Sequence, residues 1–292
     1  MQPSRTFTID HQVSLRHSRT PLRFRKGLPG RWWATRTPDG VGTLQVELVE
    51  RSVRATGWGP GAQWLLEQTP RLLGSEDDPE GFEPRHELID QLARKFPFGR
   101  FGRSDRVFES VMPTILGQKV TTIEAGRSLH KILRRLGERA PGPAELWIQP
   151  PPQRLASMGY EDFHSLGVER KRAETIIRAA HRARRMEEIC SMSPQDGLRR
   201  LLAFKGIGIW TASQALAAAT GDSDAIAVGD YHLPNIVTWA LAGEPRGDDR
   251  RMLELLEPYA GHRGRVIHLL GLAHFSAPKY GPRTAPRSIE HL

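Results

Sequence analysis

The sequence contains a single cysteine and no long apolar run, and each shortage excludes a class of protein. With Cys190 alone, an internal disulfide framework and a four-cysteine iron–sulfur cluster are both excluded. No stretch approaches the roughly 20 apolar residues that span a bilayer, and the N-terminal residues lack the apolar core of a signal peptide. The histidines show no metal-ligand spacing. We therefore expect a cytoplasmic protein with no membrane contact, no catalytic metal and no cofactor.

Acidic residues are outnumbered, so the chain is strongly basic. Its 42 Lys and Arg residues face 33 Asp and Glu residues, which gives a net charge of +9 and a pI near 10.2. DNA or RNA fits such a chain, because each phosphate that a cation neutralises releases condensed counterions. An arginine-rich proteome would also raise the pI without any nucleic acid. The charge by itself therefore leaves the partner open.

Two textures divide the chain at a polar break, residues 75–81. Before it, residues 7–9, 30–35, 41–49 and 53–56 favour β-branched and aromatic side chains, and Gly and Pro separate them. After it the pattern is helical. We predict an α+β protein with a small N-terminal antiparallel sheet domain, residues 1–75, and a helical domain, residues 80–292, built as two lobes with a cleft between them.

The helices are expected where apolar residues recur at helical spacing between Gly and Pro. The tail, residues 277–292, is rich in Pro and Arg and is expected to be extended. The predicted helices are 84–95, 105–118, 121–136, 151–157, 169–187, 194–203, 210–219, 230–241, 248–258 and 262–274.

The most informative stretch is a helical hairpin, residues 198–219. One helix ends at Lys205, and a second follows the tight turn Gly206-Ile207-Gly208. Two glycines allow positive φ and a close approach of backbone to a ligand, and the second helix then presents its N-terminal amides to a phosphate. Ile207 would insert into the core. An ordinary helix–turn–helix connection with a glycine cap would show the same short pattern.

An aspartate follows an apolar segment after the hairpin. The segment 225–228 leads to Asp230, which precedes another predicted helix. A fixed carboxylate can stabilise positive charge that develops in a reaction and can activate water. An aspartate that only caps the following helix would occupy the same position.

The string LLAFKGIGIWTA, residues 201–212, resembles the hairpin of the helix-hairpin-helix (HhH-GPD) DNA glycosylase superfamily. Asp230 stands where that superfamily has its catalytic aspartate, and the resemblance over about 80–275 is to the 3-methyladenine DNA glycosylase II (AlkA-type) branch. It implies a TATA-binding-protein-like sheet for residues 1–75. It also implies base excision repair, by a monomer, of double-stranded DNA that contains a damaged base.

The resemblance assigns DNA contacts to the hairpin. The backbone of Gly206, Ile207 and Gly208, together with Thr211, would hold the phosphate chain. A structural sodium or potassium ion could bind the loop carbonyls near Lys205 and Ile207, as in other members of the superfamily.

Trp210 distinguishes between two mechanisms. Bifunctional members of the superfamily carry at this position a lysine that attacks the sugar and forms a Schiff base. An indole cannot do so, and Lys205 lies before the hairpin. The resemblance therefore implies hydrolysis of a damaged, alkylated purine such as 3-methyladenine, without strand cleavage, and Trp210 as a wall of the base pocket.

A second motif, residues 108–120, resembles the segment of the branch that ends in a Leu-Gly-Gln turn. Gln118 would contact a base in the pocket or satisfy the backbone of the turn. The next residue of the branch is an apolar wedge that fills the gap left by the flipped base. This chain has Lys119 there, which suits a phosphate contact instead.

Three further positions complete the predicted site. Tyr231 matches an aromatic pocket residue, whose ring would favour a cationic alkylated base. His262 stands about where a well-known branch member has a tryptophan against the flipped base. Arg263 would contact phosphate or support the fold. Two alternatives stay open: a glycosylase for deaminated or oxidised bases, and a noncatalytic DNA clamp.

Overall fold

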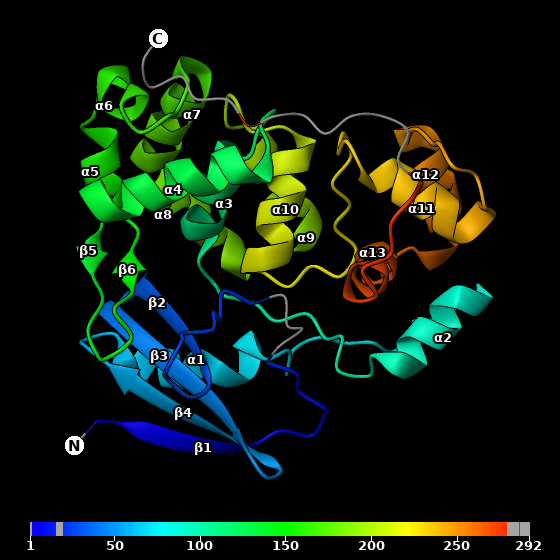
Figure 1. Cartoon of the computed structure of the whole chain (residues 1–292), viewed down its shortest axis with the longest axis horizontal. Helices are drawn as coiled ribbons and strands as arrows, with labels where there is room; N and C mark the ends of the chain where they lie inside the picture. The colour runs from blue at the N-terminus through cyan, green and yellow to red at the C-terminus, as the bar shows by residue number, and fades with distance from the viewer. Residues whose placement is uncertain (1, 16–19, 279–285, 287–292) are drawn as a thin grey trace.

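The computed structural model describes residues 2–15, 20–278 and 286, and most of the predicted tail lies outside them. It has an N-terminal antiparallel sheet and a larger helical body (Figure 1), which confirms the predicted α+β class. No helix of the described residues is long and apolar enough to cross a membrane.

The sheet contains four antiparallel strands in the order β1-β4-β3-β2. Their bounds lie close to the predicted runs: β1 Ser4–Thr8, β2 Arg31–Thr37, β3 Gly40–Val49 and β4 Ser52–Trp58. The neighbouring residues Trp32 and Trp33 point to opposite faces, as the pleat requires. Trp33 packs in the core under α1, whereas Trp32 packs against Trp58 and the segment around Leu146.

The middle of β3 is buried on both faces, whereas its sequence alternates as a half-buried strand would. Gln45 is only 8% exposed and donates from its amide to the carbonyl of Pro29. The second face is covered because the segments around Leu28 and Ala144 pack on it. At the end of the strand Leu48, on the same face as the buried Val46, is 50% exposed, so the burial does not follow the alternation of the sequence.

Helix α1, Ala62–Leu72, was not expected within the strand-rich segment. Leu65, Thr69 and Leu72 recur at helical spacing and are buried. Leu65 and Leu72 join the core that α1 shares with the sheet. The hairpin strands β5 Glu138–Arg139 and β6 Trp147–Ile148 are also additions to the predicted elements.

The first helical lobe surrounds one apolar core, which includes Met112, Ile176 and Leu216. The predicted helix 169–187 is broken at Arg182 into two helices. The elements of this lobe are α3 Val107–Leu116, α4 Thr122–Leu136, α5 Pro152–Ala156, α6 Tyr160–His164, α7 Arg170–His181, α8 Ala183–Glu187, η1 Glu188–Ser191, α9 Pro194–Leu202 and α10 Ile209–Ala219.

The second lobe joins segments far apart in the sequence. Helix α2, Glu87–Lys95, packs with α11 Leu233–Ala242, α12 Asp249–Leu256, η2 Glu257–Tyr259 and α13 Arg263–Leu272 around a separate apolar core. Figure 1 shows α2 beside these late helices, at the opposite end of the body from α4. The chain therefore crosses between the lobes before α3 and again after α10.

The polar break at residues 75–81 is a structured connection. Asp77 forms a buried ion pair with Arg265 of α13, with N–O distances of 2.7 and 3.0 Å, and both side chains are at most 5% exposed. A buried pair with two hydrogen bonds is costly to break from one side. This connecting segment thus joins the sheet domain to the second lobe.

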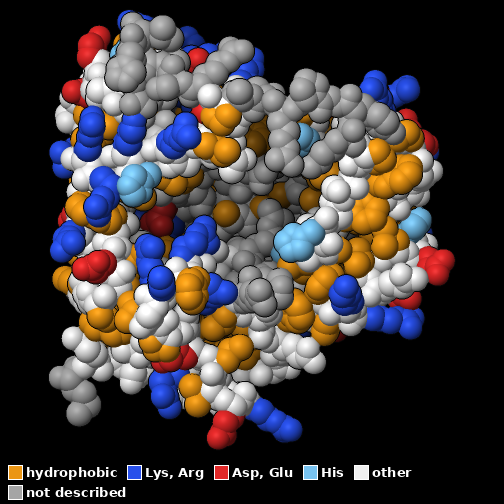
Figure 2. Space-filling model, in the orientation of Figure 1, with side chains coloured by type: hydrophobic (Ala, Val, Ile, Leu, Met, Phe, Trp, Pro, Cys, Tyr) orange, Lys and Arg blue, Asp and Glu red, His pale blue; other side chains and the backbone are white. Residues whose placement is uncertain are grey.

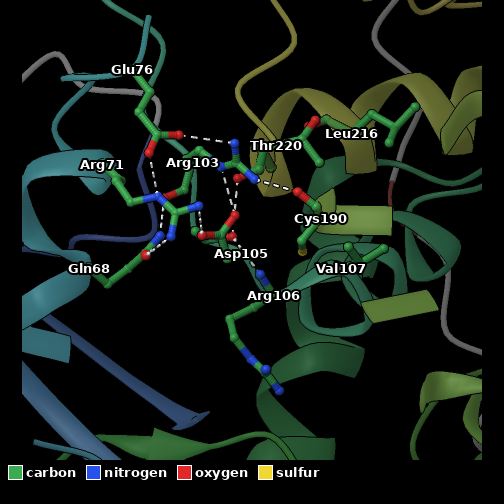
Figure 3. Close-up of polar contacts among 12 residues, drawn as sticks. Gln68, Arg71, Glu76, Arg103, Asp105, Arg106, Val107, Cys190, Leu216 and Thr220 are labelled. Carbon is green, nitrogen blue, oxygen red and sulfur yellow. Dashed lines mark hydrogen bonds and ion pairs between the residues drawn. The ribbon is translucent and has the colours of Figure 1, made fainter. Parts of the chain in front are cut away.

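A charged cluster ties the same connection to the first lobe (Figure 3). Asp105 accepts from Nη2 of Arg71 at 2.9 Å and from Nε of Arg103 at 2.7 Å, and Glu76 pairs with both arginines. Arg103 also donates to the carbonyl of Cys190. Burial raises the pKa of the Cys190 thiol to about 12, so the thiol stays protonated at neutral pH.

A buried carboxylate joins the sheet to α3. Glu109 accepts from the indole of Trp33 at 3.1 Å and from the hydroxyl of Thr35. Burial raises the pKa of this carboxyl group above its usual range. The contact fixes the sheet against the helix that leads to the Leu-Gly-Gln turn.

Candidate active site

The hairpin between α9 and α10 is the first part of the site. Ser193 caps α9, and the amide of Ile207 donates to the carbonyl of Phe204 at 3.0 Å and closes the turn. Ile207 is 4% exposed and packs in the core of the first lobe, while Gly206 and Gly208 face solvent. The turn is therefore anchored from inside and presents its backbone outward.

The two glycines serve different purposes. Gly206 has φ +96°, and a Cβ there would lie 2.3 Å from the hydroxyl oxygen of Thr175 on α7. Gly208 has φ −93°, which any residue adopts, and a Cβ there would meet nothing within 4 Å. The expected positive φ thus applies to Gly206 alone. Gly208 leaves open space in front of the first amides of α10, where a phosphate can approach.

The Leu-Gly-Gln turn supports this hairpin. The amide nitrogen of Gln118 donates to the carbonyl of Gly206 at 3.0 Å and to the hydroxyl of Thr211 at 2.8 Å. Thr211 is only 2% exposed. Gln118 therefore braces the hairpin, which agrees with the alternative that its side chain satisfies backbone. The Thr211 side chain is buried, so a DNA contact of this residue would involve its backbone.

Asp230 lies between the two lobes. One carboxylate oxygen, Oδ1, accepts from the amides of His232 at 2.8 Å and Leu233 at 3.0 Å, at the start of α11. The other, Oδ2, accepts from the indole N–H of Trp210 on α10 at 2.9 Å. The side chain is half-buried. Asp230 is therefore not the N-cap of α11, which is His232, but its side chain binds the amides of the N-cap and of the first helical residue. The same carboxylate has a fixed orientation beside the hairpin.

A second carboxylate holds the loop before Asp230, and the sequence analysis missed it. Both oxygens of Asp249, in the first turn of α12, lie 3.1 Å from the amide of Gly229. Gly229 has φ +87°, so the chain turns sharply just before the catalytic candidate. Asp248-Asp249 gives only a helix-start signal in the sequence. The contact with a residue twenty positions earlier comes from the packing of the second lobe.

A separate cavity of about 350 Å³ lies near the sheet, lined in part by Trp64, Arg106 and Ser191. Its carboxylates are already engaged: Asp105 in the charged cluster, and Glu187 with the amide of Val107 at 2.9 Å. The hollow seen in Figure 2 lies between the two helical lobes. The Asp230 site belongs to this junction of the lobes.

Comparison with known proteins shows the family of the chain. No family model matches the chain. DNA-3-methyladenine glycosylase 2 of Escherichia coli (strain K12) is 30% identical over 219 residues, which cover 74% of each chain. The chain belongs to the family of DNA-3-methyladenine glycosylase 2.

Solved structures show the same fold for this glycosylase. A 3-methyladenine DNA glycosylase from Archaeoglobus fulgidus matches with a TM-score of 0.76 at 20% identity, over 93% of this chain and 99% of that one. A Clostridium acetobutylicum 8-oxoguanine glycosylase/lyase bound to double-stranded DNA matches with a TM-score of 0.64 at 15% identity, over 82% and 86%. The similarity to these two structures supports the fold described for this chain.

The two remaining predicted pocket residues of the glycosylase, Tyr231 and His262, lie in different settings. Tyr231 is 86% exposed, and its ring stands edge-on to His232 at 4.9 Å. It is next to Asp230 but lines no enclosed pocket. His262 contacts the carbonyl of Glu80 at 3.0 Å and the ring of Phe82 at 5.7 Å, so it holds the inter-domain connection against α13. Its place in the base pocket stays a prediction.

The two cationic side chains predicted to contact phosphate, Arg263 and Lys119, differ in their surroundings. Arg263 donates from its backbone amide and from Nε to Oδ1 of Asp224, at 2.9 and 2.8 Å, so its charge is already paired. Its assignment to phosphate is corrected in favour of the structural role. Lys119 is exposed and adopts φ +56° at the tip of the turn before α4. The carbonyl of Lys205 accepts from Nε of Arg178 at 3.4 Å.

Proposed function

We propose that this chain hydrolyses the N-glycosidic bond of alkylated, 3-methyladenine-like purines in duplex DNA and leaves an abasic site without nicking the strand. The hydrogen bond of 2.9 Å between the Trp210 indole and Asp230 carries the proposal, because it fixes a carboxylate beside the exposed hairpin. The name of the Escherichia coli relative, DNA-3-methyladenine glycosylase 2, supports the choice of lesion.

The chemistry follows from this fixed anion. When the bond between the base and C1′ breaks, its electron pair leaves with the base, and the sugar becomes an oxocarbenium-like cation. Asp230 stabilises that cation by charge. Water then adds to C1′, and Asp230 can accept its proton. Three N–H donors occupy sites on the carboxylate, which offers about four lone pairs, so one position is left for the water.

The indole of Trp210 also argues against lyase chemistry. A lyase needs an amine at this point of α10 to form a Schiff base with the sugar. The indole has no such nucleophile, and its N–H is already donated to Asp230. Hydrolysis by water is therefore the reaction that this site supports.

The hairpin would hold the DNA. The open backbone at Gly208 and the first amides of α10 are placed to bind a phosphate. Lys119, next to the Gln118 that contacts Gly206, adds an exposed cation. A flipped alkylated base would cover the exposed ring of Tyr231, and a cation–π contact there contributes about 0.5–2 kcal/mol. A sodium or potassium ion on the carbonyl of Ile207 remains part of the proposal, as do a monomeric state and a cytoplasmic location.

Base release under single-turnover conditions tests the function. Duplexes with one alkylated purine, one deaminated base or one 8-oxoguanine are compared for wild type and Asp230→Asn. We expect the alkylated purine to be released fastest, and Asp230→Asn to bind that duplex while it releases base at least 100-fold more slowly. Fastest release of another base class would change the assigned substrate. No release of any base, with binding intact, would make the chain a DNA clamp.

Borohydride trapping on an abasic duplex tests the absence of lyase activity. We expect no covalent adduct and no strand nick until alkali is added. A trapped adduct would contradict the monofunctional mechanism.

A further inference from the structure

Helix α4 presents a row of cations on one exposed side. Arg127, His130 and Arg134 follow one another at spacings of three and four residues, which places them along one face of a helix. All three are exposed. Arg135 is also exposed and lies beside the row.

These charges lack the acidic neighbours that most surface helices provide. The one acid of α4, Glu124, is engaged in the capping box with Thr121, whose amide it accepts at 2.8 Å. Within the described part of the chain, neither Arg127 nor Arg135 has an ion-pair partner. Four exposed arginines of other helices pair with an acid about one turn away: Arg94 with Asp90, Arg170 with Glu174, Arg199 with Asp196 and Arg250 with Glu254.

The row begins at the site. Helix α4 follows the turn in which Gln118 holds Gly206, and Lys119 is exposed at the tip of that turn. A helix of 15 residues is about 22 Å long, which is roughly the length of six base pairs of duplex. Figure 2 shows Lys, Arg and His side chains gathered over α4 on the face that carries the hollow between the lobes.

We propose that Lys119, Arg127, His130 and Arg134 form a phosphate track that binds the duplex on one side of the lesion. The inference rests on the proposed function, because it takes duplex DNA as the substrate. Arg127 has no acidic partner within the described residues, so its guanidinium group is available to phosphate, whereas that of Arg134 lies over the Trp147 ring, 4.9 Å from the centroid. These contacts are to the phosphate backbone of the DNA, so they add affinity for a duplex of any sequence. The choice of lesion is then made in the base pocket.

Salt dependence of binding measures this track. The dissociation constant of an undamaged duplex and of a lesion duplex is measured against sodium chloride for wild type, Arg127→Gln and Arg127→Glu. Each lost phosphate contact lowers the slope of log K against log salt by about 0.9. We expect Arg127→Gln to lower it by about that amount and to weaken binding equally for both duplexes, with a larger effect for Arg127→Glu.

Arg94→Gln on α2 is the matched control, since it removes the same charge from an arginine that is paired with Asp90 on a distant helix. It should bind as wild type does. Because Arg127 is exposed and unpaired within the described chain, its variants should also melt like wild type. Equal slopes for Arg127→Gln and Arg94→Gln would overturn the proposal.

Duplex truncation tests the one-sided placement. The lesion duplex is shortened on either side of the lesion in turn, and wild type is compared with Arg127→Gln on each. One truncation should abolish the difference between the two proteins, and the other should leave it intact. A difference that survives both truncations would contradict the proposed track.

Base release at saturating DNA separates this inference from the proposed function. Arg127→Gln should release base at the wild-type rate once it is saturated. If wild type releases no base but the Arg127 effect on binding persists, the proposed function fails and the track stands. If base is released and Arg127→Gln binds like wild type, the track alone fails.

Discussion

At the scale of single residues, one carboxylate has a structural role and is also the proposed catalytic group. Asp230 accepts the first amides of α11 through one oxygen and the Trp210 indole N–H through the other. The two contacts come from different lobes, so the orientation of the carboxylate depends on how the lobes meet. A catalytic group held in this way needs no reorganisation when charge develops on the sugar.

Trp210→Phe tests the indole contact. The substitution keeps an aromatic ring but removes the donor to Oδ2 of Asp230. A hydrogen bond to a charged group contributes about 1.5–3 kcal/mol, so we expect the single-turnover rate to fall by roughly 10- to 150-fold. Duplex affinity should change little. Trp239→Phe on α11 is the control, and an equal loss in both variants would argue against a specific role for the indole.

At the scale of elements, the site is a junction of short pieces that brace one another. The Leu-Gly-Gln turn supports the hairpin through Gln118, and α7 packs against it at Thr175. The loop before Asp230 is held to α12 by Asp249. Each piece is local in sequence, but each is positioned by a partner from another element.

The two glycines of the hairpin should respond differently to alanine. Gly206→Ala forces a methyl group against Thr175 at positive φ, so we expect a loss of about 1–3 kcal/mol in the free energy of unfolding. Gly208→Ala has open space and ordinary φ, so its unfolding should match that of wild type. Its duplex affinity should nevertheless fall, because the methyl group stands where a phosphate approaches. Wild-type affinity in Gly208→Ala would show that DNA does not bind there.

Asp249→Ala tests the anchored loop. Loss of the acceptor for the Gly229 amide should make the position of Asp230 less fixed. We therefore expect the base-release rate to fall about 10-fold, while the affinity for DNA is retained. Asp249→Asn keeps an acceptor oxygen and should recover most of the rate. Asp248→Ala removes only the helix cap at Arg251 and should lower stability alone. Equal rate losses in Asp248→Ala and Asp249→Ala would contradict the positioning role.

At the scale of the whole molecule, the sheet and the two lobes are joined by buried polar contacts. Asp77 and Arg265 connect the inter-domain segment to the second lobe, and Glu109 connects the sheet to the first. These contacts hold the lobes, and hence the Asp230 site between them, in one arrangement. They are also the part of the fold most sensitive to charge state.

Glu109 predicts a dependence of stability on pH. Burial raises the pKa of this carboxyl group above its ordinary value of 4.5, so between that value and the raised pKa the folded state holds more protons than the unfolded state. The Glu109 contribution to stability therefore decreases as pH rises through this range. Glu109→Gln removes the ionisation but keeps an acceptor oxygen.

Urea unfolding from pH 4 to 8 checks this prediction. The free energy of unfolding of Glu109→Gln, relative to wild type, should increase with pH and then level off. Glu67→Gln on α1, an exposed position, should show no such trend. A flat difference for Glu109→Gln would mean that the buried carboxyl group does not titrate in this range.

The sequence by itself determined the features that depend on neighbours a few residues apart. The four strands, most of the helices, the Ser193 cap and the Gly206 turn follow from local backbone preferences and apolar spacing. Asp230 could be found because it lies at a helix start at a characteristic distance from the hairpin. The missed α1 shows the limit, since its buried face is defined by the sheet beneath it.

The tertiary structure alone decided which distant residues meet. Arg263 finds Asp224, His262 finds Glu80, and Asp249 finds Gly229 across separations of 39, 182 and 20 residues. Arg263 and His262 were predicted at the DNA or base site, and Asp249 was not predicted at all. In the structure each of the three contacts a distant segment of the chain. No local pattern contains them, because hydrogen bonds between distant segments depend on how the lobes pack, and packing is a property of the whole apolar pattern.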